Sequence, residues 1–161
     1  MLKNFELDIL HFVLTGNFCN IDLGITKNKL ISIGLKPDYW LNEKSVETSA
    51  IWGFGNIEFH FDETNKLTSI FSDSVSHKLD GGKNIQIINY WLLKRRKISL
   101  KKTIEELLSL KIDFNKILVN PGFIELRLNN GVFFAFDFVN DLNDNHNIWT
   151  MTAIWKGNVK L

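Results

Sequence analysis

The chain has 161 residues, of which 45% are hydrophobic and 23% are charged, and its formal net charge is +1. This composition excludes a disordered chain, and a charge so near zero supplies no general field that would attract nucleic acid or a membrane surface. With Cys19 as its one cysteine, the chain can form no intramolecular disulfide, and a metal site would need other ligands.

The beginning of the chain does not resemble a secretory leader. Glu6 and Asp8 interrupt the apolar region that such a leader needs. No apolar run approaches the ~18 residues of a membrane-spanning helix. We therefore expect a soluble, cytoplasmic protein with no membrane partner.

The first 40 residues predict two short helical segments. Apolar residues within 2–14 are spaced by three to four, which is typical of a helix, although this segment could also end in a strand. Thr26 is a suitable N-cap for a second helix, whose residues Leu30 and Ile33 should face inward. Pro37 is expected to end that helix.

Three strands should follow the second helix, over 49–54, 57–61 and 67–71. Gly55-Asn56 separates the first two and favours a hairpin. The middle strand alternates apolar and polar residues, so one face of its sheet should be buried and the other exposed to water.

The same order of elements is predicted for the second half of the chain. A helix and three strands are expected over 99–110, 123–128, 132–138 and 149–155. Ser99 or Thr103 can cap the helix, and Asn129-Asn130-Gly131 favours a hairpin between the first two strands.

Two segments of the chain recur. Ile57–Asp62 is echoed by Val132–Asp137, 75 residues later, and Leu67–Phe71 is echoed by Met151–Trp155, 84 residues later. A longer loop in the second copy accounts for the difference between these offsets. Such self-similarity indicates how a fold is built before any local prediction is made.

The repeat predicts one globular unit, 1–161, built of two pseudo-repeats over 1–80 and 81–161. The expected fold class is α+β. Each pseudo-repeat should be a helix plus a three-stranded antiparallel sheet, with the helices on one face of the sheet.

The two recurring strands differ in one informative way. Glu58, His60 and Asp62 share a face, which is either a general acid–base cluster or a solvated sheet face. The second copy has Phe133 and Ala135 where the first has Glu58 and His60. That strand is either covered on both faces or presents a partly exposed aromatic surface.

Two polar segments are candidate contact surfaces. The loop over 137–147, with Asp141 and Asp144, suggests calcium, but no register fits the EF-hand pattern, so we expect a polar loop or a partner contact. The basic run Lys94–Lys102 is either a solvated connector or a contact for an acidic protein or RNA. No motif for a cofactor, a metal or a catalytic set is present.

The stretch from Leu23 to Ile70, which includes Trp52-Gly53-Phe54-Gly55-Asn56-Ile57-Glu58-Phe59-His60-Phe61, resembles a widespread set of short bacterial proteins. The segments 91–108 and 131–136 resemble the second half of the same proteins. Some of these proteins are similar to immunity proteins of toxin–immunity loci, including contact-dependent inhibition systems. The repeat is also similar to the tandem modules of β-lactamase inhibitory protein, which grips an enzyme with a sheet surface.

This resemblance implies an immunity protein, not an enzyme, that binds the C-terminal domain of a cognate toxin and occludes its active site. It implies no cofactor and no metal. The residues expected to contact the partner are Trp52, Glu58, His60, Arg127, Asp141 and Asp144. Two alternatives are a small ligand-binding protein or enzyme that uses the sheet face of His60 and Glu58, and a nucleic-acid-binding module that uses Lys94–Lys102. The oligomeric state and the activity of the toxin are not indicated.

Overall fold

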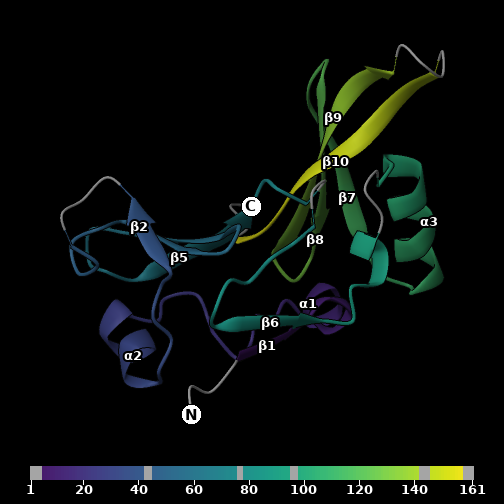
Figure 1. The fold of residues 1–161 in the computed structure, drawn as a ribbon. Coiled ribbons are helices and arrows are strands. Elements are labelled where there is room, and N and C mark those ends of the chain that lie inside the picture. Colours follow the sequence, from purple (N-terminus) through teal and green to yellow (C-terminus); the bar gives the residue numbers. More distant parts are fainter. Residues whose placement is uncertain (1–4, 42–44, 76–77, 95–97, 142–145, 158–161) are drawn as a thin grey trace.

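The computed structural model describes residues 5–41, 45–75, 78–94, 98–141 and 146–157. Its main feature is one twisted antiparallel sheet of eight strands (Figure 1). In their order across the sheet, the strands are β2 (Tyr39–Leu41), β3 (Ile51–Phe54), β4 (Ile57–Phe61), β5 (Leu67–Ser72), β10 (His146–Gly157), β9 (Val132–Asp141), β8 (Phe123–Leu128) and β7 (Phe114–Asn120).

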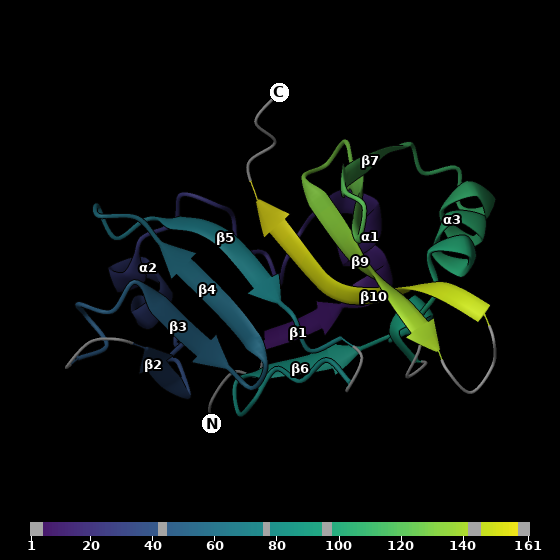
Figure 2. The same ribbon diagram turned by 90° about the horizontal axis from the view of Figure 1, so that it is seen from above.

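A smaller layer covers one face of this sheet. It contains a parallel strand pair, β1 (Phe5–Asp8) with β6 (Ile85–Ile88), and the helices α1 (Ile9–Thr15) and α2 (Lys27–Ser32). The 3₁₀ helix η1 (Trp91–Lys94) leads to α3 (Leu100–Ser109), which lies against the second half of the sheet. Figure 2 looks down on the opposite face, with α1 and α2 behind the sheet.

The predicted fold class, two modules that each join a helix to three strands, is wrong. The described chain is mostly β, and the two halves contribute four strands each to one continuous sheet. The halves join where β5 pairs with β10 in antiparallel fashion. Within this sheet, the strands absent from the prediction are its two edges, β2 and β7; the strands β1 and β6 of the smaller layer were not predicted either. The side chains of β2 and β7 are largely exposed, so these two strands lack the alternation that marks a half-buried strand.

Local features of the prediction are confirmed. Thr26 accepts a hydrogen bond from the backbone amide of Lys29 and caps α2, and Ser99 caps α3 in the same way. Both expected hairpins form, β3 with β4 and β8 with β9. The first segment differs, because its residues 5–8 form β1 before the helix begins. Asp8 then caps α1 through the amide of His11.

One hydrophobic core extends under both halves of the sheet. The ring of Phe59 on β4 lies 5.6 Å from Phe18, whose ring is 5.6 Å from Phe12 of α1. Under the second half, Phe134 and Phe136 of β9 are fully buried. The face that these residues occupy is therefore closed, and we call the opposite face of the eight-stranded sheet the open face.

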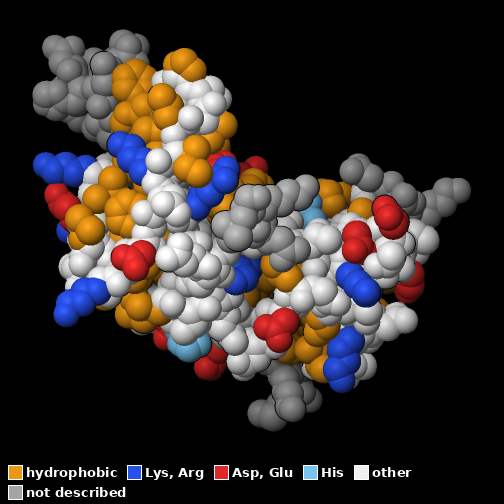
Figure 3. Space-filling view, turned by 180° about the vertical axis from the view of Figure 1, so that it is seen from behind, with side chains coloured by type: hydrophobic (Ala, Val, Ile, Leu, Met, Phe, Trp, Pro, Cys, Tyr) orange, Lys and Arg blue, Asp and Glu red, His pale blue; other side chains and the backbone are white. Residues whose placement is uncertain are grey.

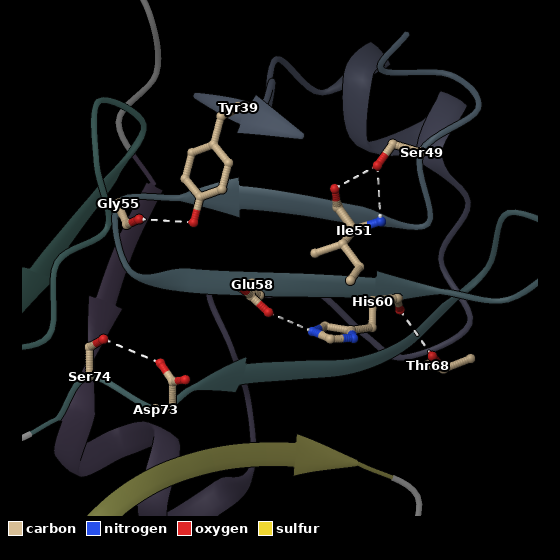
Figure 4. Close-up of polar contacts among 9 residues, drawn as sticks. All are labelled: Tyr39, Ser49, Ile51, Gly55, Glu58, His60, Thr68, Asp73 and Ser74. Atoms are coloured by element: carbon tan, nitrogen blue, oxygen red, sulfur yellow. Dashed lines mark hydrogen bonds and ion pairs between the residues drawn. The ribbon is translucent and has the colours of Figure 1, made fainter. Parts of the chain in front are cut away.

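Tyr39 on the edge strand β2 closes one end of the open face. Its ring lies over Gly53, and its hydroxyl donates a hydrogen bond to the carbonyl of Gly55 at 3.3 Å (Figure 4). A side chain at position 53 would overlap the tyrosine ring, because an added Cβ would fall among the ring atoms. Gly53 thus permits the ring to cover the strand.

We predict that Gly53→Ala displaces Tyr39 and lowers the free energy of unfolding by about 1–3 kcal/mol, the usual cost of overpacking. Denaturant unfolding would measure this change, and hydrogen exchange should quicken in β2. Gly122→Ala is the matched control, because its Cβ would meet nothing nearer than 3.6 Å. Equal stability of the two variants would contradict the predicted overlap.

None of the helices in the described ranges is long and apolar enough to cross a membrane.

Candidate functional site

The open face carries one row of side chains that crosses the whole sheet. Successive cross-strand partners in this row are Tyr39, Gly53, Glu58, Phe71, Trp155, Phe133, Arg127 and Asn115. Paired residues on neighbouring strands project to the same side of a sheet. The pairing of β5 with β10 therefore brings aromatic residues from the two halves together at the centre of the row.

Neighbouring rings at the centre of this row contact one another and end in a guanidinium, and we call them the aromatic ladder: His60, Phe71, Trp155, Phe133 and Arg127. Trp155 and Phe133 are parallel, with centroids 5.0 Å apart. The centroid of Phe71 is 6.4 Å from that of Trp155 and 6.1 Å from that of His60. The guanidinium carbon of Arg127 lies over Phe133 at 5.7 Å. Such contacts each contribute about 0.5–1.5 kcal/mol beyond area burial, so the ladder is held in one arrangement.

A hydrogen-bonded polar pair stands at each end of the aromatic ladder. His60 Nε2 lies 2.9 Å from Glu58 Oε2, and both side chains are about one third exposed (Figure 4). At the other end, Arg127 donates to Glu125 Oε2 from Nη2 at 2.7 Å and from Nε at 2.8 Å. Both pairs join residues two apart on one strand. Because both pairs lie within strands, they hold polar groups beside the apolar centre of the ladder with no contribution from a loop.

Beside the ladder the open face is hollowed. The hollow has a volume of about 1020 Å³ and exists because small residues, Ala135, Ala153 and Gly157, stand between large ones. Trp155 and Phe123 line its apolar sides. Two carboxylates, Asp73 and Asp137, also line it, as does His60 at the ladder's end.

The charges around the ladder and the hollow are mostly negative. Among the described residues, and leaving His60 aside, the carboxylates of Glu58, Glu125, Asp73 and Asp137 stand against the guanidinium of Arg127. Burial, followed by the charges of Glu58, Asp38 and Asp73, raises the pKa of Tyr39 above its ordinary value. A tyrosinate would therefore be disfavoured at this end of the row.

The structure brings together three of the predicted contact residues. Glu58 and His60 lie at one end of the ladder and Arg127 at the other. Trp52 lies on the closed face, fully buried, with its ring 4.9 Å from Phe61 and its indole N–H donating to the carbonyl of Val46 at 2.7 Å. It is therefore not part of the open face.

The predicted polar loop and basic run are only partly described. Asp141 is the last residue of β9, and the structure describes its backbone alone, while Asp144 lies outside the described residues. Residues 95–97 of the basic run also lie outside them. Lys102, at its end, pairs with Glu106 at 2.9 Å and approaches Glu105 at 3.9 Å on α3. This lysine is already paired within its own helix.

Sequence reasoning missed Phe71 and Trp155, which form the middle of the ladder. A signal for them was present, because the last residues of the recurring segments 67–71 and 151–155 are both aromatic. The pairing of those two strands with each other was not foreseen. Phe133 is only 6% exposed, because neighbours on the open face, among them Trp155, cover it.

A second apolar surface lies at the far end of the β7–β10 half. Leu118 and Val119 of β7 and Phe138 and Val139 of β9 are all exposed. Figure 3 shows hydrophobic side chains gathered at the top of the taller lobe. This patch, which we call the exposed tip, is set apart from the aromatic ladder along the strands.

The titratable groups of the open face form no metal site that the structure reveals. Within the described ranges, no group of three His, Cys, Asp or Glu side chains is placed to hold a metal ion. The Glu58–His60 pair could pass a proton to a ligand in the hollow, because His60 borders that hollow.

Comparison with known proteins returned no similarity: no family model matches the chain, and no curated protein or solved structure matches it.

Proposed function

We propose that the chain is an immunity-type protein, whose open face seats the C-terminal domain of a cognate toxin and occludes the toxin's active site. The observation that carries this proposal is the aromatic ladder with a hydrogen-bonded polar pair at each end. Binding energy in protein interfaces concentrates in Trp, Tyr and Arg side chains near the centre, surrounded by polar contacts. The ladder likewise has a tryptophan, Trp155, at its centre and ends in Arg127, with a polar pair at each end.

The size of the ladder favours a macromolecular partner. It spans five neighbouring strands, from β4 to β8, and therefore extends about 19 Å at the usual strand spacing. A stable protein interface covers about 800 Å² on each partner, which a surface of this breadth can provide together with the flanking rows. Because the rings contact one another and rest on a sheet, little side-chain entropy would be lost on binding.

The direct test uses the products of the genes that flank the gene for this chain. Each product is expressed alone to find one that arrests growth, and then together with the chain. The proposal expects one flanking product to be toxic, to be neutralised by the chain, and to co-purify with it. If no flanking product is toxic and none binds, the proposal fails.

A second candidate function is a ligand-binding protein or enzyme centred on His60. The observation that favours it is the hollow itself, which His60 borders together with Ser69 and Trp155. Under this alternative, His60→Ala would abolish a turnover or the binding of a small ligand. The same variant would bind a toxin with only a modest change in affinity, so the two functions can be separated.

A further inference from the structure

The hollow beside the aromatic ladder, about 1020 Å³ in volume, has ample room for a side chain of a partner. Its floor is formed by Ala135 and Ala153, which are cross-strand partners on β9 and β10. Trp155 is two residues further along β10, and Phe123 borders the opposite side. The small methyl side chains at the floor and the large rings at the sides leave a recess, which polar residues also line.

Two carboxylates at this hollow have no counter-charge among the residues that the structure describes. Glu58 and Glu125, on either side, are each within 3 Å of a cation or a histidine, at 2.9 and 2.7 Å. In the part of the chain that the structure describes, neither Asp73 nor Asp137 forms an ion pair. The carboxylate of Asp73 accepts a hydrogen bond from the hydroxyl of Ser74 alone (Figure 4).

The positions of these two carboxylates allow a cation to enter between them. Asp73 directly follows β5, and Asp137 lies on β9, two strands away and two residues beyond Ala135. Strand spacing and rise put their Cα atoms about 12 Å apart. That separation prevents the carboxylates from pairing with a shared proton, yet it lets both act on one charge placed in the hollow.

We infer that the partner inserts an arginine side chain into this hollow, between Asp73 and Asp137 and against Trp155. This inference rests on the proposed function and specifies the chemistry of the partner. An arginine suits the hollow because its planar guanidinium stacks on aromatic rings, is more weakly hydrated than an ammonium group, and pairs with carboxylates. An acidic side chain would meet two unpaired negative charges, and a neutral one would leave them uncompensated on burial.

The same argument predicts the character of the partner's surface. Among the residues that the structure describes, four carboxylates against one guanidinium make the open face acidic, although the whole chain has a formal charge of +1. The segment of the toxin that it covers should therefore be basic. Association should slow as ionic strength rises, because charge complementarity acts mainly on the rate of encounter.

A test that needs no toxin uses two probes, the blocked peptides acetyl-Gly-Arg-Gly-amide and acetyl-Gly-citrulline-Gly-amide, which differ only in charge. Binding is followed by NMR at the indole N–H of Trp155, assigned through the Trp155→Phe variant. We expect the arginine peptide to bind at least about fivefold more tightly than the citrulline peptide, a difference of about 1 kcal/mol. The double variant Asp73→Asn/Asp137→Asn should abolish this preference.

The matched control is Glu63→Gln/Glu105→Gln, which removes the same net charge from exposed positions elsewhere and should keep the preference. Unfolding of each variant verifies that the fold persists. If the two peptides bind equally, or neither binds, the inference is overturned. A chain that neutralises a toxin yet shows no preference contradicts this inference alone, whereas a preference without any toxic neighbour contradicts only the proposed function.

Discussion

Trp155→Ala should weaken binding of the toxin about 30- to 1000-fold, which corresponds to about 2–4 kcal/mol. Trp155 stands at the centre of the aromatic ladder, stacked on Phe133 at 5.0 Å and adjacent to Phe71. Its truncation would remove both the largest contact surface and the wall of the hollow. Calorimetry with the purified toxin domain would measure the loss, and growth rescue would report it in cells.

Trp40→Ala is the matched control for this variant. Trp40 is 41% exposed, but its cross-strand partner is the buried Trp52, so it projects from the closed face. Affinity should be unchanged in this variant. An affinity loss as large as that of Trp155→Ala would show that the toxin contacts the closed side, contrary to the proposal.

Trp52→Ala should lower stability and leave toxin affinity unchanged, the reverse of Trp155→Ala. The expected loss in the free energy of unfolding is about 3–5 kcal/mol. The side chain is fully buried, and its indole N–H is bonded to the carbonyl of Val46. Truncation leaves a cavity beside Phe61 and an acceptor without its donor. Denaturant unfolding would measure the change.

Trp52→Phe serves as the conservative comparison. It keeps most of the packing and loses the hydrogen bond, so a smaller loss of about 1–2 kcal/mol is expected. Both variants should bind the toxin normally under conditions where they are folded. If Trp52→Ala instead kept its stability and lost affinity, Trp52 would be a contact residue, as its place in the sequence pattern suggested.

The elements that the sequence predicts well depend on neighbouring residues alone. Each cap of α2 and α3 needs only a hydroxyl that accepts a hydrogen bond from the backbone amide three residues later. Each hairpin needs only glycine or asparagine at its turn. Pairings between distant segments leave no such signal. The parallel pairing of β1 with β6, and that of β5 with β10, join residues about 80 positions apart.

The same difference between local and long-range signals explains which residues of the open face could be recognised from the sequence. Glu58 and His60 were assigned to the exposed face because β4 alternates cleanly. Trp52 could not be assigned to a face from the sequence, because β3 reads Ile51-Trp52-Gly53-Phe54, in which no alternation marks a face. Its pairing with Phe59 of β4 assigns Trp52 to the closed face, because Phe59 is buried there. Trp155 and Phe71 needed the pairing between halves before they could be recognised as neighbours.

The acidic character of the open face was likewise hidden in the sequence. Asp73 and Asp137 come from opposite halves of the chain and meet at one hollow only because β5, β10 and β9 are adjacent. The near-neutral total charge offered no hint of it. The electrostatic potential of one face depends on the order of the strands in the sheet, which amino-acid composition does not reveal.

Hydroxyl-radical footprinting of the complex between the chain and its toxin tests the central claim most directly. The method reports which side chains lose contact with water on binding. We predict that oxidation of Trp155 and Phe71 falls on complex formation, while that of Trp40 and of the exposed tip, Phe138 and Leu118, stays the same. Protection of the exposed tip with unchanged oxidation of Trp155 would contradict the account and move the binding surface away from the open face.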